Sequence, residues 1–377
     1  RRVRTEDARA QPGLADRALK LQKNDAMQRA SCDHSPMEKI EYEHTARPRQ
    51  GETMAMADDI TWLRMPLPFS LNHINLWLLR DEGGWVIVDT GVDTNTSREI
   101  WQGVFSGPMA GDPATHVIAT HLHPDHVGCA DWLVHQFDVD LWMTREEYML
   151  CRVLISDTGR EAPEEGIRFY QAAGFSDEQL ANYRANFGMF GKFVKSMPDA
   201  YKRMVDGERL SFAGHDWEVI VGRGHSPEHA CLYDEQRNIL ISGDQILPTI
   251  SPNVSVWPTE PLANPLKDWF ASLEKLKSRM PEDVLVLPAH GKPFRGAHVR
   301  LDELAKEHTD RLDLLLDICA EPLRVVDTFE SLYSARIGDN NRIMATGEAI
   351  AHLRYLCETG QMNAELDGHG VKYYRRA

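Results

Sequence analysis

Short apolar runs separated by turn-forming residues recur along the chain between residues 60 and 290. Such runs predict β-strands, whereas longer stretches with apolar residues on one helical face predict helices. Helices are predicted at 96–105, 126–137 and 265–280. The predicted strands are 60–67, 73–79, 85–89, 117–119, 210–213, 217–221, 229–233, 238–242 and 283–287. Strands that alternate with helices in this way place the central part of the chain in the α/β class.

Residues 144–206 interrupt this pattern with a segment that is predicted to be helical throughout. The segment is rich in aromatic residues and methionine. Tyr183, Phe187, Phe190, Val194 and Met197 have the spacing of one helix face. We expect most of these side chains to pack a helical insertion onto the body of the protein.

The two ends of the chain differ from its central part. Residues 1–50 are polar and charged, so they can bury little apolar surface and are expected to be poorly structured or arm-like. Their acidic residues argue against a transit peptide, and an arm used in oligomer contacts is the alternative. Residues 299–377 are predicted to form three helices followed by two strands, which is the layout of a winged helix.

Composition narrows the class of protein. The 377 residues include 57 Asp and Glu against 42 Lys and Arg, a formal net charge of −15. This balance argues against nucleic-acid binding, which needs a basic surface, although Lys372, Arg375 and Arg376 make the C-terminal end locally basic. No uncharged apolar run is long enough to span a bilayer, so no membrane contact is expected. The six scattered cysteines fit reduced thiols in a cytoplasmic protein.

One stretch carries the chemistry. Residues 120–128 read Thr-His-Leu-His-Pro-Asp-His-Val-Gly, directly after a predicted buried strand. The stretch places His121, His123, Asp125 and His126 within six positions, where the strand ends and Pro124 favours a turn. Imidazole nitrogen and carboxylate oxygen are ligand types that suit zinc, iron and manganese. A polar loop with incidental histidines is the alternative.

The spacing His-x-His-x-Asp-His resembles the signature of the metallo-β-lactamase superfamily. Three more residues match the family's pattern in order and context, each after a predicted strand: His225, Asp244 and His290. The resemblance implies a four-layer αββα sandwich over residues 51–298. Residues 144–206 would then form a helical lid, with a few side chains projecting into the mouth of the active site, and residues 299–377 would form the winged-helix domain.

The resemblance also implies roles for these residues. His121, His123 and His225 would hold one divalent metal ion, Asp125, His126 and His290 a second, and Asp244 would bridge both. Zinc is the expected metal, with iron or manganese as alternatives. Asp125 would also accept a proton from the attacking water.

Three further residues are expected near the site. Asp89, in Asp-Thr-Gly at a strand end, resembles the family's first motif, in which the aspartate supports the metal site without binding metal. His73 lies in a strand, where it lines the pocket or is a structural residue. His229 follows the His225 loop and is expected to support the metal ligands without being one of them.

These features predict a hydrolase with two metal ions that acts on a small-molecule thioester or carboxylic ester, such as an acyl-CoA or a glutathione thioester. Glyoxalase II shares the seven ligands but not the expected C-terminal layout. A phosphodiesterase or endoribonuclease is the alternative, with a lactonase and a di-iron redox protein after it. Winged-helix domains of this kind commonly pack against their own protein or form homodimers, so a homodimer is a further expectation.

Overall fold

The computed structural model describes residues 39–69, 71–333 and 337–377 of the chain. The expectation for residues 1–38 therefore lies outside the described residues. The remaining part of the expected arm, residues 39–50, contains a short strand, β1 (Glu41–Tyr42), that pairs with β14 (Phe294–Arg295) of the main body.

Two seven-stranded sheets form the body of the protein. The first has the order β2-β3-β4-β5-β6-β7-β8 and the second β1-β14-β13-β12-β11-β10-β9. The first sheet comprises β2 (Thr53–Ala57), β3 (Ile60–Pro66), β4 (His73–Asp81), β5 (Gly84–Val88), β6 (Ala114–Ile118), β7 (Leu141–Met143) and β8 (Lys202–Arg203). The second sheet adds β9 (Arg209–Phe212), β10 (His215–Gly222), β11 (His229–Asp234), β12 (Ile239–Gly243) and β13 (Leu285–Pro288) to β1 and β14.

The two sheets pack face to face over an apolar core. Strand β3 contributes Ile60 and Trp62 to this core, and β10 contributes Trp217 and Val219 from the other sheet. All four side chains are almost fully buried. Burial of apolar surface on facing sheets is the main force that holds such a sandwich together.

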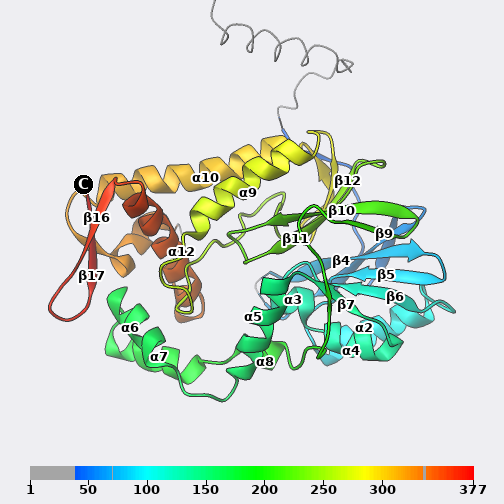
Figure 1. Cartoon of the computed structure of the whole chain (residues 1–377), viewed down its shortest axis with the longest axis horizontal. Helices are drawn as coiled ribbons and strands as arrows, with labels where there is room; N and C mark the ends of the chain where they lie inside the picture. The colour runs from blue at the N-terminus through cyan, green and yellow to red at the C-terminus, as the bar shows by residue number, and fades with distance from the viewer. Residues whose placement is uncertain (1–38, 70, 334–336) are drawn as a thin grey trace, which may run out of the picture. The chain divides into compact units, whose positions relative to one another are not determined.

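Helices cover the outer faces of both sheets (Figure 1). On the first sheet lie α2 (Asn95–Ser106), α3 (Pro124–Val127), α4 (Ala130–Phe137) and α5 (Arg145–Ser156). On the second sheet lie α9 (Pro265–Arg279) and α10 (Ala297–Ile318). The four layers predicted from the sequence are therefore confirmed. No helix among the described residues is long and apolar enough to cross a membrane.

The insertion is helical, but it is not one continuous face. After α5 it contains α6 (Glu164–Ala172), α7 (Asp177–Asn186) and α8 (Phe190–Phe193), and it ends at β8. The expected helix through Tyr183 and Met197 is wrong, because α7 ends at Asn186. Gly188 has a φ of +72°, and a Cβ there would lie 2.4 Å from the carbonyl oxygen of Asp157, so the chain turns at this glycine.

The C-terminal part contains β15 (Leu323–Arg324), the 3₁₀ turn η1 (Val325–Thr328), α11 (Phe329–Leu332), α12 (Asp339–Glu358), β16 (Met362–Leu366) and β17 (Lys372–Arg376). The first and third predicted helices and the strand pair lie close to their expected positions. The second, expected over residues 325–337, is only η1 and the short α11, and β15 adds a third strand to the small sheet. The assignment to the winged-helix class stays a prediction.

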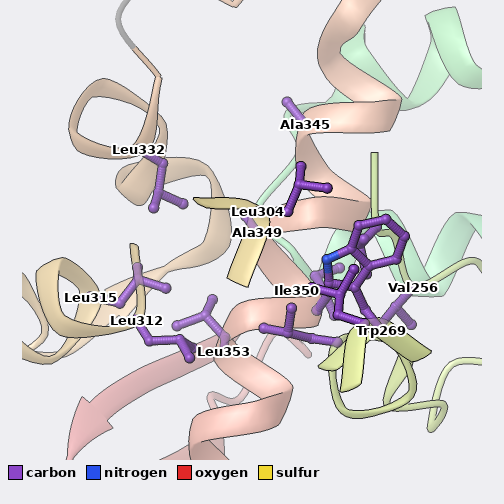
Figure 2. Close-up of a cluster of buried hydrophobic side chains, with 14 of the residues drawn as sticks. Val256, Trp269, Leu304, Leu312, Leu315, Leu332, Ala345, Ala349, Ile350 and Leu353 are labelled. Carbon is purple, nitrogen blue, oxygen red and sulfur yellow. The ribbon is translucent and has the colours of Figure 1, made fainter. Parts of the chain in front are cut away.

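The C-terminal elements share one apolar core with the second sheet and its helices. Figure 2 shows Leu353 and Ile350 of α12 in one cluster with Val256 and Trp269. Val256 lies in the loop before α9, and Trp269 lies in α9 itself. Tyr170 of the insertion belongs to the same cluster of buried side chains. The C-terminal part is thus fixed to the body by apolar contacts.

Candidate metal centre

The strand ends bring the predicted ligands together. The loop after β6 carries His121, His123, Asp125 and His126, and Pro124 at the first position of α3 turns the chain between the second and third of these. The other three predicted ligands follow the carboxyl ends of strands in the opposite sheet: His225 after β10, Asp244 after β12 and His290 after β13. Ligands from both sheets therefore meet at one edge of the sandwich.

A first group that could hold a metal ion consists of His121, His123, His225 and Asp244. One ligand atom from each lies within 4.8 Å of the others. His121 Nε2 is 2.8 Å from His123 Nδ1, and His225 Nε2 is 3.4 Å from Asp244 Oδ2. Three imidazoles and one carboxylate are a ligand set that suits a divalent metal ion.

A second group that could hold a metal ion consists of Asp125, His126 and His290. His290 Nε2 lies 3.4 Å from Asp125 Oδ2. Asp244 also reaches this group, because its Oδ1 is 3.3 Å from His290 Nε2 and 3.5 Å from His126 Nε2. One oxygen of Asp244 thus faces each group.

Buried atoms without a hydrogen-bond partner test whether these residues fit metal ions. Nε2 of His126, His225 and His290 and Oδ1 of Asp244 are all buried and make no hydrogen bond. Unpaired buried polar atoms are costly and therefore rare. Four of them pointing into one small space fit a pair of divalent cations, which would satisfy every one.

The opposite ring nitrogen of each of these three histidines is held by an acceptor. Nδ1 of His126 donates to Asp89 Oδ2, Nδ1 of His290 to the carbonyl of His73, and Nδ1 of His225 to the carbonyl of Asn253, each at 2.8 Å. These bonds fix the tautomer in which Nε2 has a free lone pair for a metal.

Asp89 is fixed behind the centre. Its carboxylate also accepts hydrogen bonds from Thr120 N and Thr120 Oγ1, at 2.8 and 3.0 Å, and its backbone has a φ of +61°. A non-glycine residue in this conformation is strained. The buried aspartate therefore orients His126 without belonging to either ligand group.

His229 lies beneath Asp244. Its Nε2 accepts a hydrogen bond of 3.0 Å from the backbone N–H of Asp244, and its ring is fully buried. Gly243 precedes Asp244 with a φ of +50°, and a Cβ there would lie 2.5 Å from His229 Nε2. Only glycine lets the chain pass this close to the imidazole.

Charges within the centre shift the ionisation of its members. Burial opposes the charge of Asp244, but His290 and His126 hold the pKa of its carboxyl well below the usual range. Burial lowers and Asp244 raises the pKa of His290, with a net rise to about 10. The carboxylates are therefore ionised, and divalent cations would have to displace protons from the histidines, as is usual for metal sites.

Three charged residues near the centre were not predicted from the sequence: Glu147 and Arg64 are buried, and Glu348 is partly buried. Glu147 of α5 accepts hydrogen bonds from the loops that carry His121, His123 and His225. Glu348 of α12 accepts a bond of 3.3 Å from the side chain of Asn253. Arg64 of β3 is 8% exposed and lies opposite Asn75 in the sheet. The hydrophobic pattern of the sequence does not distinguish these residues. Their neighbours along the chain are charged or apolar, as they are for ordinary surface residues and ordinary strand residues.

Comparison with known proteins agrees with this geometry. Residues 70–317 match the family model described as "Metallo-beta-lactamase superfamily", and residues 312–377 match "Metallo-beta-lactamase-like, C-terminal domain". The solved structure of a beta-lactamase domain protein from Burkholderia ambifaria is 38% identical, with a TM-score of 0.82 over 90% of this chain and 98% of that one. A metallo-beta-lactamase family protein from Thermus thermophilus is 28% identical, with a TM-score of 0.71 over 86% of this chain and 100% of that one.

Relatives in sequence include hydrolases. "Probable metallo-hydrolase YqjP" of Bacillus subtilis is 21% identical, over 84% of this chain and 98% of the relative. "Acyl-coenzyme A thioesterase MBLAC2" of Homo sapiens is 25% identical, over 68% of this chain and 86% of the relative. With its two face-to-face sheets and its histidine and aspartate groups at the strand ends, the chain belongs to the metallo-beta-lactamase superfamily and is a hydrolase.

Proposed function

We propose that this hydrolase uses two divalent metal ions, zinc first and iron or manganese as alternatives, to cleave a thioester or a related carboxylic ester. The observation that carries the proposal is the placement of Asp244 between the two ligand groups, with one carboxylate oxygen within 3.4 Å of His225 Nε2 and the other within 3.3 Å of His290 Nε2. A carboxylate in this position can bridge two cations.

The seven residues would bind two cations. His121, His123 and His225 would hold one cation and Asp125, His126 and His290 the other, with Asp244 shared. Two cations held side by side lower the pKa of water and polarise a substrate carbonyl.

Asp125 would accept the proton of the attacking water. Its side chain is 15% exposed, so it retains access to solvent. Burial alone would raise its pKa, but His126 and His290 lower it, so that the carboxylate is ionised and able to take a proton.

Two observations favour a thioester that carries negative charge, such as an acyl-CoA or a glutathione thioester. Two curated relatives, from Bos taurus and Homo sapiens, are named as acyl-coenzyme A thioesterases. In addition, Arg64 has no acidic partner among the described residues, and its Nε makes no hydrogen bond. The other buried arginine of the described chain, Arg300, donates to both Glu303 and Glu307. A buried guanidinium without an acid is costly, and an anionic substrate would offset that cost.

Arg64 lies close to the second ligand group. Asn75, opposite Arg64 in the sheet, donates to the carbonyls of Pro288 and Gly291, which flank His290. Burial first, and then the charge of Arg64, lowers the pKa of His73 to about 4. The ring centroid of His73 is 6.2 Å from that of His290. Arg64 therefore places a positive charge at this side of the centre, next to a neutral His73.

The test is turnover of the metal-loaded protein on acyl-CoA and glutathione thioesters, with bis(p-nitrophenyl) phosphate and single-stranded RNA in parallel. We expect thioester cleavage with kcat in the ordinary range of about 1 to 1000 per second. Cleavage of the phosphodiester or the RNA without thioester cleavage would replace this proposal by a phosphodiesterase.

A further inference from the structure

Glu147 is a fully buried carboxylate in the first turn of α5, outside both ligand groups. Its neighbour Glu146 is half exposed and pairs with Arg223. Glu147, in contrast, has no lysine or arginine partner among the described ion pairs. Burying a carboxylate costs several kcal/mol unless hydrogen bonds replace its water. The bonds that replace water here come from the loops that hold metal ligands.

The carboxylate of Glu147 accepts three hydrogen bonds. Oε2 accepts a hydrogen bond of 3.0 Å from the backbone N–H of Leu122. Oε1 accepts one of 2.6 Å from Ser226 Oγ and one of 2.7 Å from the backbone N–H of Glu228. Burial raises the pKa of Glu147 to about 7, and the three bonds oppose that rise.

The donors belong to two loops from different sheets. Leu122 lies between His121 and His123, which follow β6 of the first sheet. Ser226 follows directly on His225, after β10 of the second sheet. A single side chain thus joins the backbone segments that carry all three histidines of the first ligand group.

The rest of the α5 N-terminus strengthens this junction. Thr144 Oγ1 donates to the carbonyl of Glu228 at 2.7 Å, and the backbone N–H of Glu146 donates to Glu228 Oε2 at 2.9 Å. The helix start is therefore held against the His225 loop by two further bonds to Glu228, so Glu147 has little freedom to move. A rigid acceptor fixes the donors that bind to it.

We propose that Glu147 is a positioning residue that sets the distance between the His121–His123 turn and His225, and that it thereby controls the metal affinity of the first ligand group. The inference rests on the proposed metal centre, but it does not depend on the substrate. It predicts a selective effect on one of the two groups, because every bond of Glu147 reaches a loop of the first group.

The test is Glu147→Gln in a His290→Ala background, which leaves only the first group complete. A glutamine keeps the size of the side chain but presents an NH₂ to at least one N–H or O–H donor in either orientation of the amide, so one bond becomes a repulsion. The measurement is the Kd for Zn²⁺ by competition with a chromophoric chelator. We expect Zn²⁺ to bind about 10- to 100-fold more weakly than to His290→Ala alone.

Glu165→Gln in the same background is the matched control. Glu165 lies in α6, and its exposed side chain pairs with Arg168 of the same helix, away from both ligand loops. This variant should retain the Zn²⁺ affinity of its parent. In the chain with His290 intact, Glu147→Gln should lose activity at limiting zinc and regain most of it when zinc is in excess.

Ser226→Ala provides a second, milder test, because it removes one of the three bonds without adding a repulsion. We expect Ser226→Ala to bind Zn²⁺ several-fold more weakly. When Glu147→Gln is added, the loss of Zn²⁺ affinity should be smaller than the product of the losses in the two single variants. Unchanged Zn²⁺ affinity in Ser226→Ala and in Glu147→Gln, even with a lower melting temperature, would overturn the inference and leave Glu147 a purely structural residue. Normal metal binding with no thioester cleavage would instead refute only the proposed function.

Discussion

The two aspartates of the candidate centre differ in what they contact. Asp244 faces both ligand groups, so its replacement would disturb both metal ions at once. Asp125 belongs to the second group only and is 15% exposed at the side chain. Replacing Asp125 therefore tests proton transfer without removing a member of the first ligand group.

Asp125→Ala is expected to lower kcat by at least about 100-fold, because the proton acceptor and one ligand of the second group are both lost. Steady-state kinetics on the best thioester would measure the loss, and circular dichroism would confirm the fold. Asp140→Ala, which removes an exposed carboxylate that pairs with Lys202 and belongs to neither ligand group, is the control. Full activity in Asp125→Ala would contradict the proposed mechanism.

Arg64→Gln is expected to raise the KM for negatively charged thioesters about 10-fold, which is the effect of losing roughly 1.4 kcal/mol of interaction with the anion. The KM for an uncharged N-acetylcysteamine thioester of the same acyl group should change little. Arg64→Lys keeps the charge, so its KM for the charged thioester should lie between that of the parent and that of Arg64→Gln. An equal change for both substrates would show that Arg64 does not recognise charge.

The residues of the centre could be found in the sequence to different degrees. The seven predicted ligands and Asp89 stand at strand ends in a local pattern, and the structure brings them together there. Glu147 follows Arg145 and Glu146, a run typical of the exposed first turn of a helix. Its burial arises only because the loops after β6 and β10 close over it, which is a long-range effect that local patterning does not contain.

Helix α12 connects the C-terminal part with the metal centre. Glu348 pairs with Arg311 of α10 at 3.1 Å and accepts a bond from Asn253, whose carbonyl holds His225. One turn further along, Nδ1 of His352 donates to the carbonyl of Glu348, and Nδ1 of His308 donates to Nε2 of His352. Both imidazoles are fully buried and neutral in this arrangement.

This buried pair predicts a loss of stability in acid. Burial lowers the pKa of His352 to about 4, whereas the unfolded chain protonates a histidine near 6.5. The unfolded state therefore binds more protons between these values, and the free energy of unfolding falls as the pH drops through the window. His352 alone should contribute a loss of about 2 kcal/mol between pH 7.5 and pH 5.

His352→Gln tests this expectation, since glutamine can still accept a bond from His308 but does not titrate. Denaturant unfolding at several pH values would show a shallower decline for the variant than for the parent. The ligand histidines contribute equally to both proteins and cancel in the difference. Parallel declines would mean that His352 is not held neutral by burial.

At the scale of elements, periodicity predicted the strands of the sandwich and helices α2, α9 and α10 well. The prediction was wrong for residues 183–197, where the apolar spacing continues past Gly188 but the helix does not. The two parts of this segment pack on different cores: Tyr183 against the core of the second sheet and the C-terminal helices, and Phe190 and Val194 against that of the first sheet. Spacing alone cannot show which core a side chain will join.

At the scale of the whole molecule, the ligand groups connect the two sheets. Four of the predicted ligands come from the first sheet and three from the second. Metal ions that bind the folded chain and not the unfolded one stabilise the folded state by mass action. The centre should therefore contribute to stability as well as to chemistry.

Removal of the metal ions by EDTA is expected to lower the melting temperature by several degrees. For an ion present at about 1000 times its Kd, the loss is about 4 kcal/mol per site. Differential scanning fluorimetry of the loaded and the chelated protein would measure the shift. Asp244→Asn should show a much smaller difference, because both groups lose an ionised oxygen. An identical shift in this variant would place the stabilising metal elsewhere.

The core shared by α9, α12 and residues 250–258 limits how parts of this protein can be exchanged with those of relatives. Val256 N donates to the carbonyl of Gly347, and a Cβ at Gly347 would lie 2.8 Å from Ser255 Oγ. A chimera that takes α12 from one relative must therefore take residues 250–258 from the same relative. Otherwise the mismatch at this contact is transmitted through Asn253 to His225, and a recombined chain would fold with an altered metal centre.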